Sequence, residues 1–118
     1  YSSTHMTIVY KVQGYDLTTS TLTTVLTIDA SSRAIVKEIT LANDIGSSTE
    51  VNLYVRDSSA STDYKFYHII IPANNTEYAV NNTLVLEEGD SLKFQSATGN
   101  AISGQISYAL LNRSQENG

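Results

Sequence analysis

The clearest strand pattern in the chain is Glu50-Val51-Asn52-Leu53-Tyr54-Val55-Arg56, in which polar and apolar residues alternate strictly. Neighbouring side chains along a β-strand point to opposite faces of the sheet, so this pattern predicts a strand with one buried and one wet face. The core-facing residues are predicted to be Val51, Leu53 and Val55. The residues predicted on the opposite face are Asn52, Tyr54 and Arg56.

Runs of similar character recur on both sides of this stretch at intervals of about ten residues, the spacing typical of sandwiches and barrels. They are rich in β-branched and aromatic residues, and polar turns separate them. The predicted strands span residues 7–12, 21–28, 34–42, 51–56, 63–71, 77–80 with 84–86, 92–96 and 102–110. With about eight strands, the chain is predicted to be an all-β, single-domain antiparallel β-sandwich, jelly-roll-like in type.

An immunoglobulin-like sandwich is the alternative fold, although the Trp and Cys typical of that core are missing. Residues 31–43 could also be read at helical spacing, but their β-branched content favours a strand. The predicted core consists of Ile35, Ile39, Leu41, Val51, Leu53, Val55, Phe94, Ile106 and Tyr108.

Length and charge limit the possible functions. At 118 residues the chain can build one domain with a single core, and without cysteine it cannot form disulfides. Its net charge of −5 argues against nucleic acid, which favours clustered Lys and Arg. No apolar run approaches the roughly 20 residues of a membrane-spanning helix, so no membrane contact is predicted. Residues 1–5 resemble a cloning scar, residues 6–112 form the predicted domain, and residues 113–118 are expected to be a polar tail.

Residues able to perform catalysis are scarce. The histidines are His5 and His68 alone, and His68 alternates with Phe66 and Ile70. Metal-binding jelly rolls of the cupin type place a second histidine two residues away, so His68 is expected to be a packed or interfacial residue. We therefore predict that the chain is not an enzyme, with no catalytic residue, no cofactor and no metal.

The acidic turn around Gly89 has two possible interpretations. Glu87, Glu88 and Asp90 surround this glycine and could join other loops in a calcium site, which needs about six or more oxygen ligands. The simpler interpretation is a solvated turn, in which Gly89 supplies the positive φ that other residues avoid.

Tyrosine is the residue type that suggests a function. Tyr54 is predicted to point away from the core, and Tyr64 and Tyr67 are predicted on opposite faces of one strand. Exposed tyrosines beside Arg and Asn are typical of protein interfaces, and also of surfaces on which sugars stack. The predicted interface consists of Asn52, Tyr54 and Arg56.

Several segments resemble small structural proteins of tailed bacteriophages. The similarity lies in a threonine-rich strand and polar turn followed by Arg33-Ala34-Ile35-Val36, in Ile71-Pro72-Ala73, and in Leu86-Glu87-Glu88-Gly89-Asp90-Ser91-Leu92. The matching segments are residues 25–43, 50–55, 70–73 and 84–93. The resemblance covers most of residues 22–111 and consists of turn-and-strand patterns.

The resemblance implies a non-enzymatic virion component, either a head decoration protein or a neck, tail or baseplate accessory. Its implied partners are copies of itself, as a homo-oligomer with a trimer favoured, and other virion proteins. The rival hypothesis is a carbohydrate-binding receptor-recognition domain of a phage fibre or surface protein, in which exposed Tyr and Asn would bind a glycan.

Overall fold

The computed structural model describes the chain over residues 4–79 and 83–115, and its side chains over residues 8–79 and 83–112. This part of the chain forms strands and contains no helix, so no helix in it could cross a membrane. Its nine strands are β1 (Thr4–Leu17), β2 (Thr23–Thr27), β3 (Ser32–Asn43), β4 (Thr49–Asp57), β5 (Thr62–Ile71), β6 (Thr76–Tyr78), β7 (Leu84–Leu86), β8 (Ser91–Ser96) and β9 (Ile102–Gln115). The predicted all-β class is confirmed, and the segment that could be read as a helix is β3.

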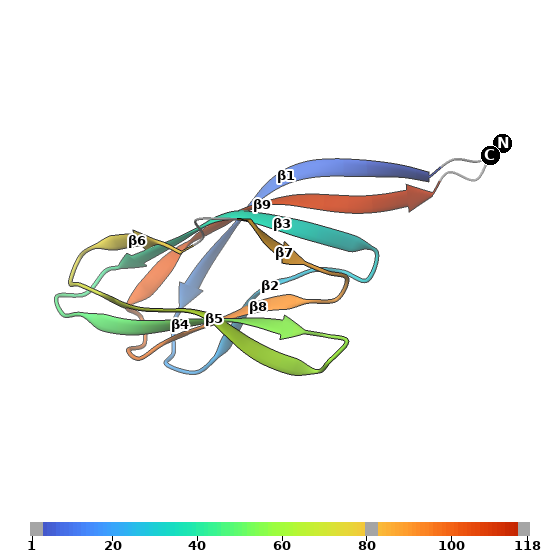
Figure 1. The fold of residues 1–118 in the computed structure, drawn as a ribbon. Helices are drawn as coiled ribbons and strands as arrows, with labels where there is room; N and C mark the ends of the chain where they lie inside the picture. The colour runs from blue at the N-terminus through green and yellow to red at the C-terminus, as the bar shows by residue number, and fades with distance from the viewer. Residues whose placement is uncertain (1–3, 80–82, 116–118) are drawn as a thin grey trace.

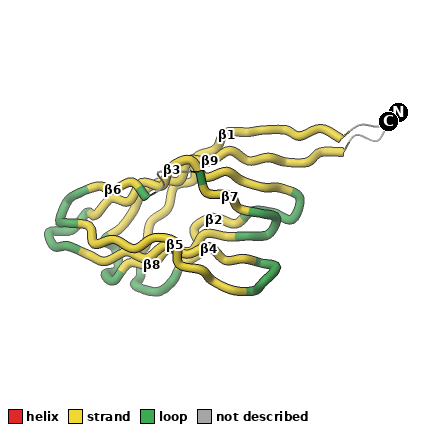
Figure 2. The backbone as a smooth tube through the Cα atoms, viewed as in Figure 1, coloured by secondary structure: helices red, strands yellow, loops and turns green. Residues whose placement is uncertain are grey.

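Two antiparallel sheets face each other as a sandwich (Figures 1 and 2). Sheet A has the strand order β1-β9-β3-β6, with β7 also paired to β3, and sheet B has the order β2-β8-β4-β5. Strands distant in the sequence therefore lie side by side, as in the predicted jelly-roll-like sandwich. The inner faces of the two sheets meet, and each sheet has an outer face that points away from the other.

β1 and β9 are the longest strands, at 14 residues each, and they pair along their whole length. Their paired ends extend beyond the sandwich as a two-stranded ribbon (Figure 1). The molecule is consequently elongated, with extents of 61 × 26 × 23 Å. Thr4 and His5 lie within β1, and residues 113–115 lie within β9.

The core lies between the two sheets and contains most of the residues that alternation predicted. The predicted residues found buried there are Ile39, Leu41, Val51, Leu53, Phe94, Ile106 and Tyr108. Val55 packs against this cluster while remaining partly exposed. Alternation is reliable here because these residues lie in regular parts of their strands.

The prediction that Ile35 lies in the core is wrong. The pairing of β3 with β9 shifts between Val36 and Glu38, which leaves Lys37 as an extra residue in β3. A bulge of this kind changes which residues of a strand face the core. Val36 and Ile39 are therefore both buried, whereas Ile35 lies half-buried on the outer face of sheet A.

The prediction that Tyr64 and Tyr67 lie on opposite faces of a strand is also wrong. A second bulge in β5 adds Phe66, so that Tyr67 pairs with Leu53 and Tyr64 pairs with Val55. Directly paired residues share a face, so both tyrosines lie on the inner face of sheet B. Tyr67 packs against the core, whereas Tyr64 remains exposed.

Candidate interaction surfaces

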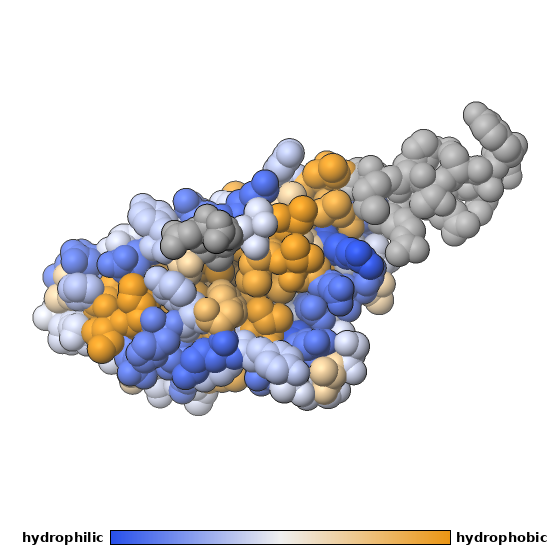
Figure 3. All heavy atoms as spheres, in the orientation of Figure 1, coloured by the Kyte–Doolittle hydropathy of each residue, from blue (hydrophilic) through white to orange (hydrophobic). Residues whose placement is uncertain are grey.

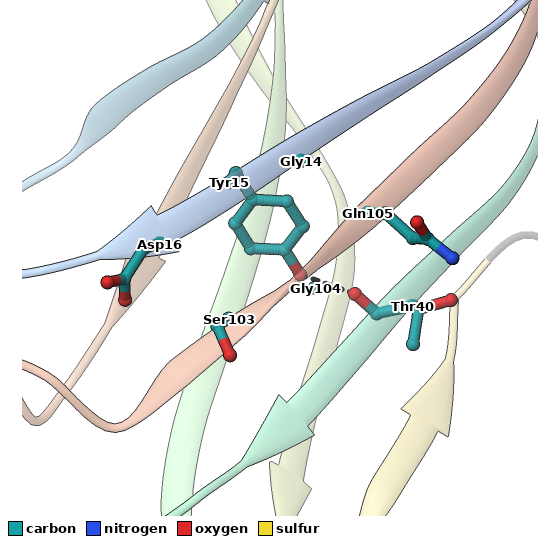
Figure 4. Close-up of a pocket in the computed structure, with 7 residues that line it drawn as sticks. All are labelled: Gly14, Tyr15, Asp16, Thr40, Ser103, Gly104 and Gln105. Atoms are coloured by element: carbon teal, nitrogen blue, oxygen red, sulfur yellow. Dashed lines mark hydrogen bonds between the residues drawn. The ribbon is translucent and has the colours of Figure 1, made fainter.

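A tyrosine hydroxyl connects β1 to β3 across β9. Tyr15 pairs with Gly104, and its Oη donates a 2.6 Å hydrogen bond to the carbonyl oxygen of Thr40 (Figure 4). Its ring packs edge-on against Phe94 of sheet B, with 5.1 Å between ring centroids. A Cβ at position 104 would overlap the Thr40 carbonyl, so this close approach requires glycine. Burial raises the pKa of the Tyr15 hydroxyl far above its usual value, which keeps it protonated as a donor.

An open hollow adjoins this contact on sheet A (Figure 4). Its polar lining comes from Asp16, Thr40, Ser103 and Gln105, and Gly14 and Gly104 complete it. The Tyr15 ring is partly buried and already packed against another aromatic ring. The hollow thus offers hydrogen-bonding groups, but its one aromatic ring is not a free platform for a sugar.

An unbroken row of apolar side chains crosses the outer face of sheet A. Tyr10 of β1 pairs with Ala109 of β9, Ala109 pairs with Ile35 of β3, and Ile35 pairs with Val85 of β7. These four residues, here called the apolar row, share one face because paired residues do. The two ends of the row are open to solvent, since Tyr10 is 78% exposed and Val85 is 57% exposed.

Two shorter rows flank the apolar row, one on each side along the strands. One flank consists of Ile8, Leu111 and Arg33. The other flank consists of Val12, Ser107 and Glu38. Ile8 and Val12 are also exposed, so the outer face of sheet A carries apolar side chains over several neighbouring positions. In Figure 3, apolar residues gather around β7 and at the base of the ribbon.

The three residues predicted as an interface lie together on the outer face of sheet B. Asn52, Tyr54 and Arg56 alternate along β4 with Val51 and Leu53, which are fully buried in the core. The sequence therefore placed these three side chains on the correct face. Asn52 is buried even so, while the other two are half-buried.

Side chains of the neighbouring strand β5 interact with each of these residues. His68 Nδ1 lies 2.8 Å from Oδ1 of Asn52, and the histidine side chain remains 49% exposed. Arg56 donates a 3.4 Å hydrogen bond to Asp63, whose carboxylate lies 3.7 Å from Lys93 Nζ. The ammonium group of Lys65 on β5 lies 5.6 Å from the centroid of the Tyr54 ring. This face is therefore polar and internally paired.

The acidic turn is held by backbone hydrogen bonds to Asp90, one from within the turn and one from the loop after β4. Gly89 has a φ of 81°, as predicted for a turn that requires glycine. Asp90 is buried, and its two carboxylate oxygens accept hydrogen bonds from the backbone N–H groups of Ser58 and Glu87, at 3.1 and 3.0 Å. Over the residues that the structure describes, no group of three or more His, Cys, Asp or Glu side chains could hold a metal ion. The positive φ of Gly89 confirms that part of the simpler interpretation, whereas Asp90 is buried and bonded to the backbone.

Sequence reasoning missed the apolar row. Alternation correctly gave Ile8, Tyr10 and Val12 a common face, which was a usable signal. The row also needs Ile35, and alternation assigned that residue to the core because the bulge at Lys37 leaves no mark in the sequence.

Comparisons with known proteins show the fold. Neither protein-family models nor curated protein sequences gave a match. Among solved structures, a chain from the acid-stable capsid of Helicobacter pylori bacteriophage KHP30 aligns with a TM-score of 0.57 and 10% identity, covering 100% of both chains. A chain from Bacillus endospore appendages, a family of disulfide-linked pili, aligns with a TM-score of 0.51 and 14% identity, covering 92% of this chain and 89% of that chain. Both are components of large protein assemblies.

Proposed function

We propose that this chain is a non-enzymatic structural component of a virus particle that acts through protein–protein contacts, as a head decoration protein or a neck, tail or baseplate accessory. The observation that carries the proposal is the apolar row on sheet A, whose ends Tyr10 and Val85 are exposed beside the exposed Ile8 and Val12. Soluble monomers rarely expose large contiguous apolar patches, and such patches are typical of protein contacts. The similarity in fold to a phage capsid chain, over the full length of both, supports a virion location.

Two kinds of partner fit the two outer faces. The apolar face of sheet A suits copies of the same chain, because apolar surface is most common in contacts between identical subunits. The polar face around Asn52, Tyr54 and Arg56 is proposed to contact a different virion protein, since paired charges add specificity and steering to an interface. The resemblance to phage proteins favours three copies, whereas a face that packs against itself joins two, and a mass measurement in solution decides between these numbers.

Purified particles from the organism that encodes the chain provide the test. We expect mass spectrometry of nuclease-treated, gradient-purified particles to detect the chain at a constant ratio to the major coat protein. Labelled antibody should then place it on the head or on the tail in electron micrographs. Particles that lack the chain, while cell extracts contain it, would contradict the proposal.

Carbohydrate binding is the second candidate, and the polar hollow beside Gly14 is the observation that favours it. A sugar could bind there through Asp16, Ser103 and Gln105. A glycan array with and without calcium tests this function, with Gln105→Ala as the control variant. Saturable binding that this variant abolishes would support a receptor-recognition role, and binding to no glycan would remove it.

A further inference from the structure

We propose that two copies of this chain pack through the outer faces of sheet A, about a twofold axis that runs along the apolar row. This inference deepens the proposed function by naming the partner of that surface as a second copy. The axis lies between sheet A of one copy and sheet A of the other, and it runs across the strands of both. Each residue of the apolar row therefore faces the same residue of the second copy, and the two flanking rows exchange places.

The apolar positions match under this rotation. Tyr10 meets Tyr10 and Val85 meets Val85, so the two exposed ends of the row are covered together. Ile8 lies two residues before Tyr10 on β1 and Val12 lies two residues after it, so Ile8 of one copy faces Val12 of the other. Burial of these side chains removes apolar surface from water, which drives association.

The charges match as well. Arg33 belongs to one flank and Glu38 to the other, and both lie on the outer face of β3. Exchange of the flanks places Arg33 opposite Glu38 of the second copy, and twofold symmetry produces this pair twice. The Arg33 side chain is 55% exposed and the Glu38 residue is exposed, so both can reach across an interface. Paired opposite charges at the edge of an apolar contact fix its orientation.

Other twofold arrangements lose this match. An axis parallel to the strands keeps each flank on its own side, so Arg33 would no longer face Glu38. Pairing through the free edge of β1 would form a continuous sheet but leave Val85 exposed, three strands away from the contact. Only the face-to-face arrangement about the apolar row covers both ends of the row and pairs both charges.

The mass in solution is the first measurement. Sedimentation equilibrium or light scattering of the full chain should give twice the 12.9 kDa of a single copy over a concentration series. A mass of one copy throughout the series, or of three, would overturn the inference. If the chain is present in particles but monomeric in solution, the inference fails while the proposed function stands.

A charge exchange tests the orientation. Arg33→Glu and Glu38→Arg should each weaken dimerisation by about tenfold or more, because each places like charges opposite each other twice. The double variant Arg33→Glu/Glu38→Arg restores opposite charges and should recover the parent dissociation constant to within about threefold. The Arg33 side chain also contacts Glu88 at 3.1 Å, and the double variant does not restore that contact. Recovery therefore reports on the contact between copies, and a double variant as weak as the single ones would reject the orientation.

Crosslinking distinguishes the face from the edge, and the absence of native cysteine makes single-cysteine variants clean probes. In the face-to-face dimer the two Val85 positions lie one sheet separation apart, about 10 Å, whereas edge pairing through β1 separates them by about 34 Å. A short bismaleimide should therefore crosslink Val85→Cys efficiently. The control is Ile70→Cys, an equally exposed position on sheet B, which should remain uncrosslinked. The opposite result would place the contact elsewhere.

Discussion

The outer faces of the two sheets differ in how their side chains are satisfied. On sheet B, a polar or charged side chain of β5 interacts with each of Asn52, Tyr54 and Arg56. On sheet A, Tyr10, Ile35 and Val85 form a row that is apolar apart from the tyrosine hydroxyl, and the ends of that row face solvent. A face whose polar groups are paired is stable in water, whereas covering an apolar face with a partner lowers the free energy of the system.

Interface residues in a sandwich should be sought where paired strands bring apolar side chains together on an outer face. The Tyr and Arg content of β4 is typical of interfaces, yet in this fold those side chains already interact with neighbours. Sheet A attracts less attention by composition because its apolar residues come from four strands and meet only through register. The cross-strand row, and not the residue type in one strand, identifies the surface that most needs a partner.

The largest effect on stability is expected from a substitution in the core, and a substitution on the outer face of sheet A should affect association instead. Leu53 is fully buried, so Leu53→Ala should lower the free energy of unfolding by about 2–5 kcal/mol through loss of apolar contact and a cavity. Ile35 lies on the outer face, so Ile35→Ala should cost about 1 kcal/mol or less in dilute protein while weakening the dimer. Urea denaturation measures the first quantity and sedimentation the second. A large stability loss in Ile35→Ala would return that residue to the core and contradict the outer-face assignment.

The second prediction tests how closely the strands of sheet A approach each other. Gly104→Ala places a methyl group on the Thr40 carbonyl, so the strands must move apart at a cost toward the upper end of about 1–3 kcal/mol. Gly46→Ala is the matched control, because an added Cβ there meets no atom within 4 Å. Thermal unfolding of both variants measures the difference. Equal midpoints would show that β3 and β9 are not held in this close register.

The fold and the polar face could be predicted from the sequence because both depend on regular alternation. Val51, Leu53 and their neighbours on β4 follow a period of two without interruption, so their faces were correct. Ile35, Tyr64 and Tyr67 were misplaced because single-residue bulges at Lys37 and Phe66 shift the register. A bulge depends on the pairing of two distant strands, and no local pattern in one strand records it. The apolar row was invisible for the same reason.

The third prediction concerns the hydroxyl that connects β1 to β3. Tyr15→Phe removes the donor to the Thr40 carbonyl and should cost about 1–2 kcal/mol at neutral pH. The folded-state pKa of Tyr15 is raised, so its contribution is complete below the usual tyrosine pKa of 10.0 and declines as the pH rises above that value. Urea denaturation should therefore show the gap between parent and variant shrinking between about pH 9 and pH 11. Tyr78→Phe, at an exposed position outside the apolar row and its flanks, serves as the control, and a gap that widens over this range would contradict the assignment.

The smallest effect is expected on the polar face of sheet B. The double variant Tyr54→Ala/Arg56→Ala loses a half-exposed ion pair and a cation–aromatic contact, each worth about 1 kcal/mol or less, so the fold should remain intact. If sheet A joins the copies, this variant should dimerise like the parent, while Tyr10→Ser/Val85→Ser should not. If the β4 residues contact another virion protein, the same variant should bind more weakly to particles that lack the chain. Loss of dimerisation in Tyr54→Ala/Arg56→Ala, with Tyr10→Ser/Val85→Ser unaffected, would reverse the roles of the two faces.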